Sequence, residues 1–252
     1  MDYRTARFKT FDGLNLAWTE TGSPNGRPTL VLHGFLASAQ LNWIDPGLAS
    51  AMAATGRRII LPDLRGHGQS EAPTSPAAYP KDALPQDQEV LLAQLGMTDF
   101  DLVGYSLGAR TAVRMLARGH SRPTNVFLGG MGEGGITTVG TRKDYFEDGI
   151  KNGPNAKDAR AGTYIQTILK QRGMSPEAAL GVLSTQVSTS REVLTTIKTT
   201  VLVVNGDQDR DNGDPMALAA ALGNATCQLV PGNHLSAVAE PAFRDALVAF
   251  LS

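Results

Sequence analysis

Cysteine is almost absent from this sequence. Among 252 residues the only cysteine is Cys227, so no internal disulfide can form and the several thiolates of a structural zinc or iron–sulfur site are missing. The N-terminal residues also lack the apolar run of a signal peptide, and no later stretch of about 18 apolar residues follows. We therefore expect a cytoplasmic protein that does not enter a membrane.

An excess of charge of one sign is also missing. The 23 Lys and Arg residues nearly balance the 24 Asp and Glu residues, and the net charge is −1. Without a field of one sign, nucleic acid and anionic membranes are not expected partners, whereas a small neutral molecule is. Hydrophobic residues make up 42% of the chain, which excludes disorder. The sequence does not specify an oligomeric state.

Short apolar runs alternate with longer amphipathic segments along the chain, a pattern typical of a parallel sheet with crossover helices. The first two runs flank Asp12-Gly13, which predicts a hairpin. The eight predicted strands are 7–10, 14–20, 29–32, 58–61, 100–105, 125–128, 201–205 and 227–230. The predicted helices of this core are 41–54, 81–95, 107–118, 215–222 and 241–251. The expected fold class is therefore α/β.

One interval interrupts the alternation, because no strand is predicted between residues 128 and 201, which is too long for a simple connection. Its helical segments predict a helical cap over residues 131–198, inserted into a core of residues 1–130 and 199–252. Gly130–Gly135 matches G-x-G-x-x-G but lacks a following helix and the ribose-binding acid of a dinucleotide site. We expect a glycine hinge into the cap there.

Gly104-Tyr105-Ser106-Leu107-Gly108 follows a predicted strand and opens a predicted helix. A turn tight enough to lift a serine hydroxyl above the sheet leaves no room for side chains two residues on either side. The motif therefore predicts that Ser106 is a nucleophile. Because the helix begins directly after it, the backbone N–H of Leu107 is expected to stabilise an oxyanion.

A serine nucleophile needs a base, and the sequence offers four histidines. His33 and His67 lie in Gly-containing turns and His120 at the end of a helix, where structural roles suffice. His234 follows the last predicted strand, on the side where open α/β sheets bind ligands. By elimination His234 is the predicted base.

The base in turn needs a carboxylate to orient it. Candidates follow the strand 201–205, namely Asp207, Asp209, Asp211 and Asp214. Asp209 is favoured because it lies far enough into the loop to reach a neighbouring strand end, while Asp207 is the second choice. Asp214 precedes Pro215 and suits a helix cap.

These motifs resemble those of the α/β-hydrolase superfamily, in the order that its members have. Besides the serine motif, the resemblance rests on Leu32–Phe35, Asp63–Ser70, Gly206–Asp209 and Gly232–His234. It implies an α/β-hydrolase fold with a helical cap, and a triad of Ser106, Asp209 and His234. It also implies an oxyanion hole formed by the backbone N–H groups of Phe35 and Leu107.

The resemblance implies a serine esterase that cleaves a small to medium carboxylic ester through an acyl-enzyme and needs no cofactor or metal. The serine is unlike the aspartate on which epoxide hydrolases and haloalkane dehalogenases depend. Lactone opening, carbon–carbon hydrolysis and peroxyacid formation use the same triad and stay open.

Pocket residues are harder to predict. Tyr105, Trp43 and Arg110 are candidates for substrate binding, as are Tyr145, Phe146, Ile150, Tyr164, Ile165 and Ile168 in the cap. Tyr105–Gly108 followed by Arg110 also resembles the menaquinone-pathway synthase, a lyase whose arginines hold substrate carboxylates; here Arg142, Arg160 and Arg172 would assist. A ligand-binding protein that retains the fold without catalysis is a third alternative.

Overall fold

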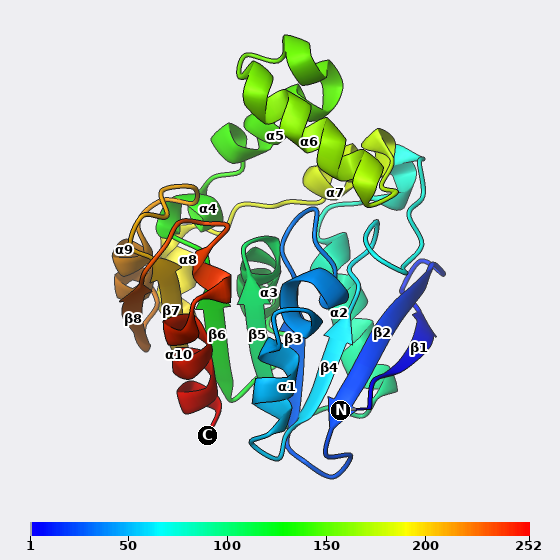
Figure 1. Ribbon diagram of the computed structural model, residues 1–252. Coiled ribbons are helices and arrows are strands. Elements are labelled where there is room, and N and C mark those ends of the chain that lie inside the picture. The colour runs from blue at the N-terminus through cyan, green and yellow to red at the C-terminus, as the bar shows by residue number, and fades with distance from the viewer. Residues whose placement is uncertain (1) are drawn as a thin grey trace.

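The computed structural model describes residues 2–252. Eight strands form one sheet in the order β1-β2-β4-β3-β5-β6-β7-β8 (Figure 1). They are β1 (Arg4–Lys9), β2 (Asn15–Gly22), β3 (Pro28–Leu32), β4 (Arg58–Pro62), β5 (Asp101–Tyr105), β6 (Asn125–Gly129), β7 (Thr200–Gly206) and β8 (Ala225–Val230). β2 pairs antiparallel with β1 and β4, and all further neighbours are parallel. The predicted mostly parallel sheet is confirmed, and each strand lies within a few residues of its predicted place.

Helices cover both faces of the sheet (Figure 1). α1 (Leu48–Ala53) and α10 (Pro241–Leu251) contact each other on one face, while α2 (Ala83–Gln94) and α3 (Leu107–Arg118) contact each other on the opposite face. Because side chains alternate along a strand, Leu30 and Leu32 enter one hydrophobic cluster and Val31 the other. Burial on both faces explains why the parallel strands are continuously apolar.

The predicted helix 41–54 is divided in two. A π-helix, η1 (Gln40–Ile44), precedes α1. Pro46, which has no N–H to donate, and Gly47, with φ of 78°, lie between them. The helix therefore ends and restarts at this pair.

Only part of segment 131–198 stands apart from the sheet. α5 (Gly140–Asn152), α6 (Ala159–Gln171) and α7 (Pro176–Ser184) lie beyond the carboxyl ends of the parallel strands, at the top of Figure 1. α4 (Glu133–Thr137) and α8 (Arg191–Thr196) instead contact α9 (Pro215–Ala221) beside the sheet. The part beyond the sheet is therefore smaller than the predicted insertion.

The glycine-rich segment after β6 is closely packed. A Cβ on Gly132 would lie 2.2 Å from the carbonyl oxygen of Gly213. Glu133 donates its N–H to Asp214 O at 3.0 Å, and Gly135 donates to Asn212 O at 2.7 Å. Contrary to the sequence-based expectation, a helix, α4, opens directly here, and close approach to the 212–214 loop accounts for the glycines.

In the part of the chain that the structure describes, no helix combines the length and the apolar character that crossing a bilayer requires.

Candidate active site

Ser106 occupies the turn between β5 and α3 with φ of 51° and ψ of −111°, which is strained for a residue with a side chain. A Cβ on Gly104 would lie 2.5 Å from the Gly108 carbonyl carbon, and one on Gly108 would lie 2.2 Å from Leu32 O. The turn is fixed by the Ser106 N–H, which donates to Gly129 O at 2.9 Å. The glycine spacing thus has the steric reason inferred from the sequence.

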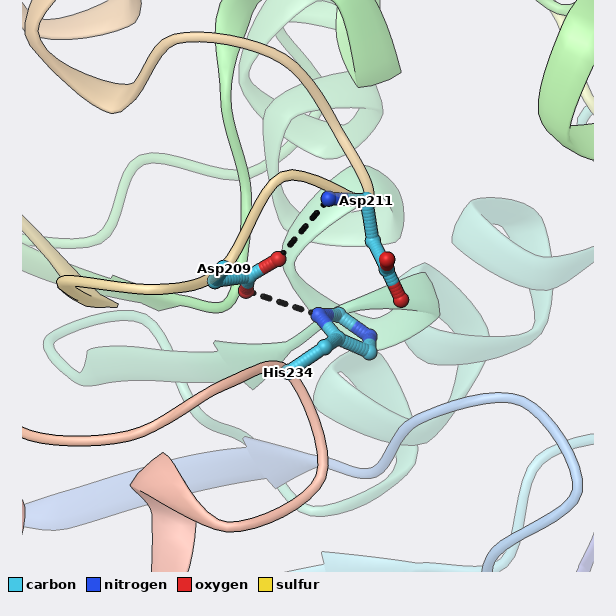
Figure 2. Close-up of side chains that lie close together, drawn as sticks. All are labelled: Asp209, Asp211 and His234. Atoms are coloured by element: carbon cyan, nitrogen blue, oxygen red, sulfur yellow. Dashed lines mark hydrogen bonds and ion pairs between the residues drawn. The ribbon is translucent and has the colours of Figure 1, made fainter.

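Ser106, His234 and Asp209 form a continuous hydrogen-bonded chain. His234 Nε2 lies 3.0 Å from Ser106 Oγ, and His234 Nδ1 lies 2.8 Å from Asp209 Oδ2 (Figure 2 shows the second contact). Since a carboxylate only accepts, the proton belongs on Nδ1, which leaves Nε2 free to accept from the serine hydroxyl. The structure therefore brings together the three residues selected from the sequence.

Asp209 is held in its charged form. Burial raises the pKa of this carboxyl, but hydrogen bonds from His234 and the Asp211 N–H, with the charge of Arg142, outweigh burial and place the pKa below its usual value. The Asp211 N–H donates to Asp209 Oδ1 at 3.0 Å (Figure 2). Asp207 has another role: its Oδ1 accepts from the Gly232 N–H at 3.1 Å.

Tyr105 and Trp43 do not contact the candidate substrate space, which corrects their assignment as pocket residues. The Tyr105 hydroxyl donates to His234 O at 2.6 Å, and its ring packs against Phe243. Trp43 is fully buried in the core beneath α1. Tyr105 thus supports the loop that carries His234, and Trp43 packs the core.

Two backbone N–H groups near Ser106 have no partner. Neither Phe35 nor Leu107 donates its N–H to any residue within 2–252. Both residues line the cavity in which the Ser106 side chain lies. These free donors are the ones that the family resemblance implied for an oxyanion hole.

Side chains hold the loop around Phe35 in shape. The Gly34 N–H donates to Asn42 Oδ1 at 2.9 Å, and the Leu36 N–H donates to His67 Nε2 at 3.3 Å. His33 accepts from the Leu64 N–H at 3.0 Å and contacts Gly34 O through Nδ1 at 2.8 Å. The role of Asn42 carried no recognisable signal in the sequence.

The other histidines serve structure. Burial lowers the pKa of His33 to about 4, and burial together with neighbouring His33 lowers that of His67 to about 3. Both imidazoles are therefore neutral at pH 7 and act as fixed hydrogen-bonding groups. His120 is exposed, two residues beyond the end of α3.

A cavity of about 420 Å³ opens beside Ser106. It is bounded by the loop around Phe35, by α4, by the 210–213 loop and by α5 of the segment beyond the sheet. Phe146 of α5 contacts Phe35 edge to face, with centroids 5.0 Å apart. This volume suits a small to medium organic molecule.

The cap residues proposed for an apolar pocket are divided between different places. Tyr145 and Phe146 line the cavity. Ile150 and Ile165 are buried, Tyr164 is 54% exposed, and Ile168 faces a separate small pocket near His67. Only the first two are positioned to contact a molecule beside Ser106.

Arg110 lines the cavity, but its guanidinium already donates hydrogen bonds to the backbone. Its guanidinium donates to the carbonyl oxygens of Gly135, Thr138 and Val187. Burial and the neighbouring charge of Arg114 lower its pKa to about 10. Arg110 therefore secures the segment around α4 through both terminal nitrogens, while its buried Nε has no partner among residues 2–252.

Asp209, Asp211 and His234 also approach one another as metal ligands do, since one ligand atom from each lies within 4.8 Å of the others (Figure 2). The 2.8 Å distance between His234 Nδ1 and Asp209 Oδ2 is that of a hydrogen bond, in which Nδ1 donates to the carboxylate. We therefore read this cluster as a hydrogen-bonded pair with a nearby second carboxylate.

Part of the chain is similar in sequence to known proteins of the α/β-hydrolase fold. The α/β-hydrolase-fold family model matches residues 28–128. Epoxide hydrolase 2 of Siraitia grosvenorii is 38% identical over 101 residues, covering 40% of this chain and 30% of its own. The sn-1-specific diacylglycerol lipase ABHD11 of Mus musculus is 45% identical over 89 residues, covering 34% and 27%. The alignments thus span less than a third of these two relatives.

The whole chain also matches solved structures. An esterase from Exiguobacterium antarcticum superposes with a TM-score of 0.77 at 19% identity, covering 98% of each chain. A putative 2-succinyl-6-hydroxy-2,4-cyclohexadiene-1-carboxylate synthase of Bacillus subtilis is 28% identical, covering 56% of this chain and 49% of its own. A non-heme chloroperoxidase of Streptomyces lividans is 30% identical, covering 43% and 38%. One fold thus carries several activities among these proteins. The chain therefore has the α/β-hydrolase fold.

Proposed function

We propose that this protein is a serine hydrolase that cleaves a small to medium carboxylic ester. The observation that carries the proposal is the hydrogen-bonded chain Ser106–His234–Asp209 beside the cavity. A serine hydroxyl is a weak nucleophile at neutral pH, and a neutral imidazole at hydrogen-bond distance removes its proton as it attacks.

In this mechanism Ser106 Oγ bonds to the acyl carbon while His234 takes the hydroxyl proton. The carbonyl oxygen becomes an oxyanion, held by the N–H groups of Phe35 and Leu107. His234 then protonates the leaving alkoxide as the ester C–O bond breaks. Water, deprotonated by His234, attacks the acyl-enzyme, and the acid leaves with Ser106 restored.

The residues of the site bear on epoxide hydrolysis and on the lyase and ligand-binding alternatives. Epoxide hydrolases rely on an aspartate where this chain has Ser106. The lyase alternative assigned substrate carboxylates to Arg110, assisted by Arg142, Arg160 or Arg172. The terminal nitrogens of Arg110 already donate to backbone carbonyls, which leaves Arg142 as the one of these that lines the cavity with its charge exposed. The ligand-binding alternative gives no reason for a strained serine hydrogen-bonded to a histidine.

We further propose that α5, α6 and α7 form a cap over the site. The inserted segment that contains this cap runs from residue 131 to residue 198. α5 supplies Tyr145 and Phe146 to the cavity wall. Acyl chains that fill the space between Ser106 and α5 are therefore expected to react best.

Hydrolysis of p-nitrophenyl esters from acetate to decanoate tests the proposal. The protein is expected to show a chain-length optimum, and Ser106→Ala to abolish turnover. Ser75→Ala is the matched control, because Ser75 is exposed and does not line the cavity. A fluorophosphonate should add one label to the unaltered protein and none to Ser106→Ala.

Equal turnover by Ser106→Ala would overturn the assignment of the nucleophile. Labelling of Ser106 without ester turnover would point to the lyase, and the absence of both to the ligand-binding alternative.

A further inference from the structure

Positive side chains gather around the cavity beside Ser106. Among the described residues that line it, four are cations and one is an anion: Arg110, Arg142, Lys143, Arg210 and Asp211. The net charge of the whole chain is −1. The positive lining is therefore a local feature of this cavity.

Two of the four cations are committed to other partners. Arg110 donates to backbone carbonyls, and Lys143 forms a 2.8 Å ion pair with Glu147 on the same helix. Arg142 and Arg210 remain, one on α5 and the other in the loop that carries Asp209. They are the cations that a bound molecule can reach.

Arg142 is oriented before any ligand arrives. Its guanidinium carbon lies 4.8 Å from the Phe146 ring centroid and 5.6 Å from that of Tyr145. Stacking on two rings limits the conformations of a long side chain, so less entropy is lost when it binds an anion. This geometry is that of a prepared anion-binding group.

The present partner of Arg142 is a carboxylate of the protein itself. Arg142 Nη2 lies 2.7 Å from Asp211 Oδ2, and the two side chains are 32% and 38% exposed. Ion pairs this exposed contribute little net stability, typically below about 1 kcal/mol. A second carboxylate can therefore replace Asp211 at small cost.

Arg210 makes the same region more positive. Its Nη1 donates to Asp209 O at 3.2 Å, and no carboxylate within residues 2–252 lies at ion-pair distance from it. Asp211, which is paired with Arg142, is thus the one acidic side chain among the described residues of the cavity wall, while Arg210 lines the same wall without a carboxylate partner.

We propose that the cavity selects esters whose acyl part ends in a second, free carboxylate, and that this carboxylate replaces Asp211 on Arg142. The proposal rests on the esterase activity proposed above and names its substrate class, the monoesters of dicarboxylic acids. Hydrolysis adds one water and releases an alcohol and a dicarboxylate.

The test compares p-nitrophenyl monoesters of adipic, pimelic and suberic acids with neutral isosteres in which an isopropyl group replaces the free carboxylate. These chain lengths avoid the rapid cyclisation to anhydrides of shorter monoesters. For the best-fitting pair, kcat/KM is expected to favour the anionic ester by about tenfold, equivalent to about 1.4 kcal/mol. Raising the salt concentration should weaken this preference.

Two variants should move the preference in opposite directions. Arg142→Gln is expected to lower the ratio of kcat/KM for anionic over neutral ester about tenfold. Asp211→Asn should raise it several-fold, because it frees Arg142 while keeping the backbone N–H that donates to Asp209. Lys151→Gln removes the same charge from α5 outside the cavity wall and should leave the ratio within about twofold.

The outcomes separate this inference from the proposed function. Equal hydrolysis of both esters in all three pairs would overturn the carboxylate selectivity and leave the esterase standing. A preference that persists in Arg142→Gln would overturn the role of Arg142. Hydrolysis of none of these esters, nor of the simple esters above, would overturn the proposed function itself.

Discussion

The hydroxyl of Tyr105 donates a 2.6 Å hydrogen bond to the backbone carbonyl of His234. Tyr105 is the residue before the strained Ser106, so one side chain ties the serine turn to the histidine loop across 129 positions of sequence. Burial raises the pKa of Tyr105, as do the charges of Asp209 and Asp211, which keeps the hydroxyl a donor. Its function is therefore to position the imidazole.

Tyr105→Phe removes this hydrogen bond and keeps the ring. We expect kcat on p-nitrophenyl esters to fall several-fold with KM unchanged, because His234 becomes less well placed while the cavity wall is unaltered. The free energy of unfolding in urea should fall by about 1–3 kcal/mol, the cost of an unsatisfied buried carbonyl.

Tyr79→Phe is the matched control for that variant, since the Tyr79 hydroxyl donates to Pro73 O at 2.8 Å away from the site. It should lose stability with kcat unchanged. A lower kcat in both variants would show that the effect follows general destabilisation and would contradict a positioning role for Tyr105.

The glycines of the serine turn give a second prediction. Gly104→Ala places a Cβ 2.5 Å from the backbone of Gly108, so we expect a loss of about 3 kcal/mol or failure to fold. Gly140→Ala at the start of α5 meets nothing within 4 Å and should leave stability unchanged or slightly higher. Urea unfolding of both variants measures the difference, and similar stabilities would contradict the steric argument.

Much of the fold could be predicted because it depends on local patterns. Continuous apolar runs marked the strands, and Asp12-Gly13 marked the hairpin, where Gly13 has φ of 88°. The division of the helix 41–54 was missed because its apolar spacing continues across Pro46. The packing of α4 and α8 against α9 beside the sheet could not be predicted from local patterns, because it is a tertiary contact.

In the site, too, the features set by local motifs could be predicted and those set by tertiary contacts could not. Ser106, Asp209 and His234 could be selected because each lies in a short motif at a predicted strand end. Arg142 and Asp211 were not recognised as a pair, because their 2.7 Å contact joins positions 69 residues apart. Tyr105 and Trp43 were misassigned because an aromatic residue near a motif looks the same in sequence whether it lines a cavity or packs a core.

The two buried histidines predict how stability depends on pH. Burial lowers the pKa of His33 to about 4 and that of His67 to about 3, while unfolded histidine titrates near 6.5. Between pH 6.5 and 4 the unfolded chain therefore binds more protons, and stability falls as the pH falls. Each histidine contributes a slope of up to about 1.4 kcal/mol per pH unit.

Over pH 7.5 to 4.5 the two histidines together contribute a slope approaching two protons, as measured by urea unfolding. Burial raises the pKa of Asp87 to about 7, so the folded chain binds a proton there that offsets up to one of the two. His67→Gln should lower that slope by about one proton, whereas His120→Gln should leave it unchanged, because His120 is exposed. A free energy of unfolding independent of pH across this window would contradict the assignment of His33 and His67 as buried neutral groups.

Replacing the carboxylates of the 206–211 loop separates catalysis from loop structure. In Asp209→Asn the amide can donate to His234 Nδ1, which favours the tautomer with its proton on Nε2, where it can no longer accept from Ser106. We expect kcat to fall by about 10³–10⁴-fold with the fold intact. Asp207→Asn, which changes a carboxylate that accepts from Gly232 and not from His234, should stay within about threefold of the unaltered enzyme. A large loss of kcat in Asp207→Asn with little loss in Asp209→Asn would reverse the assignment of the acid. Comparable losses of kcat in both variants would mean that loop geometry, and not the tautomer of His234, limits the reaction.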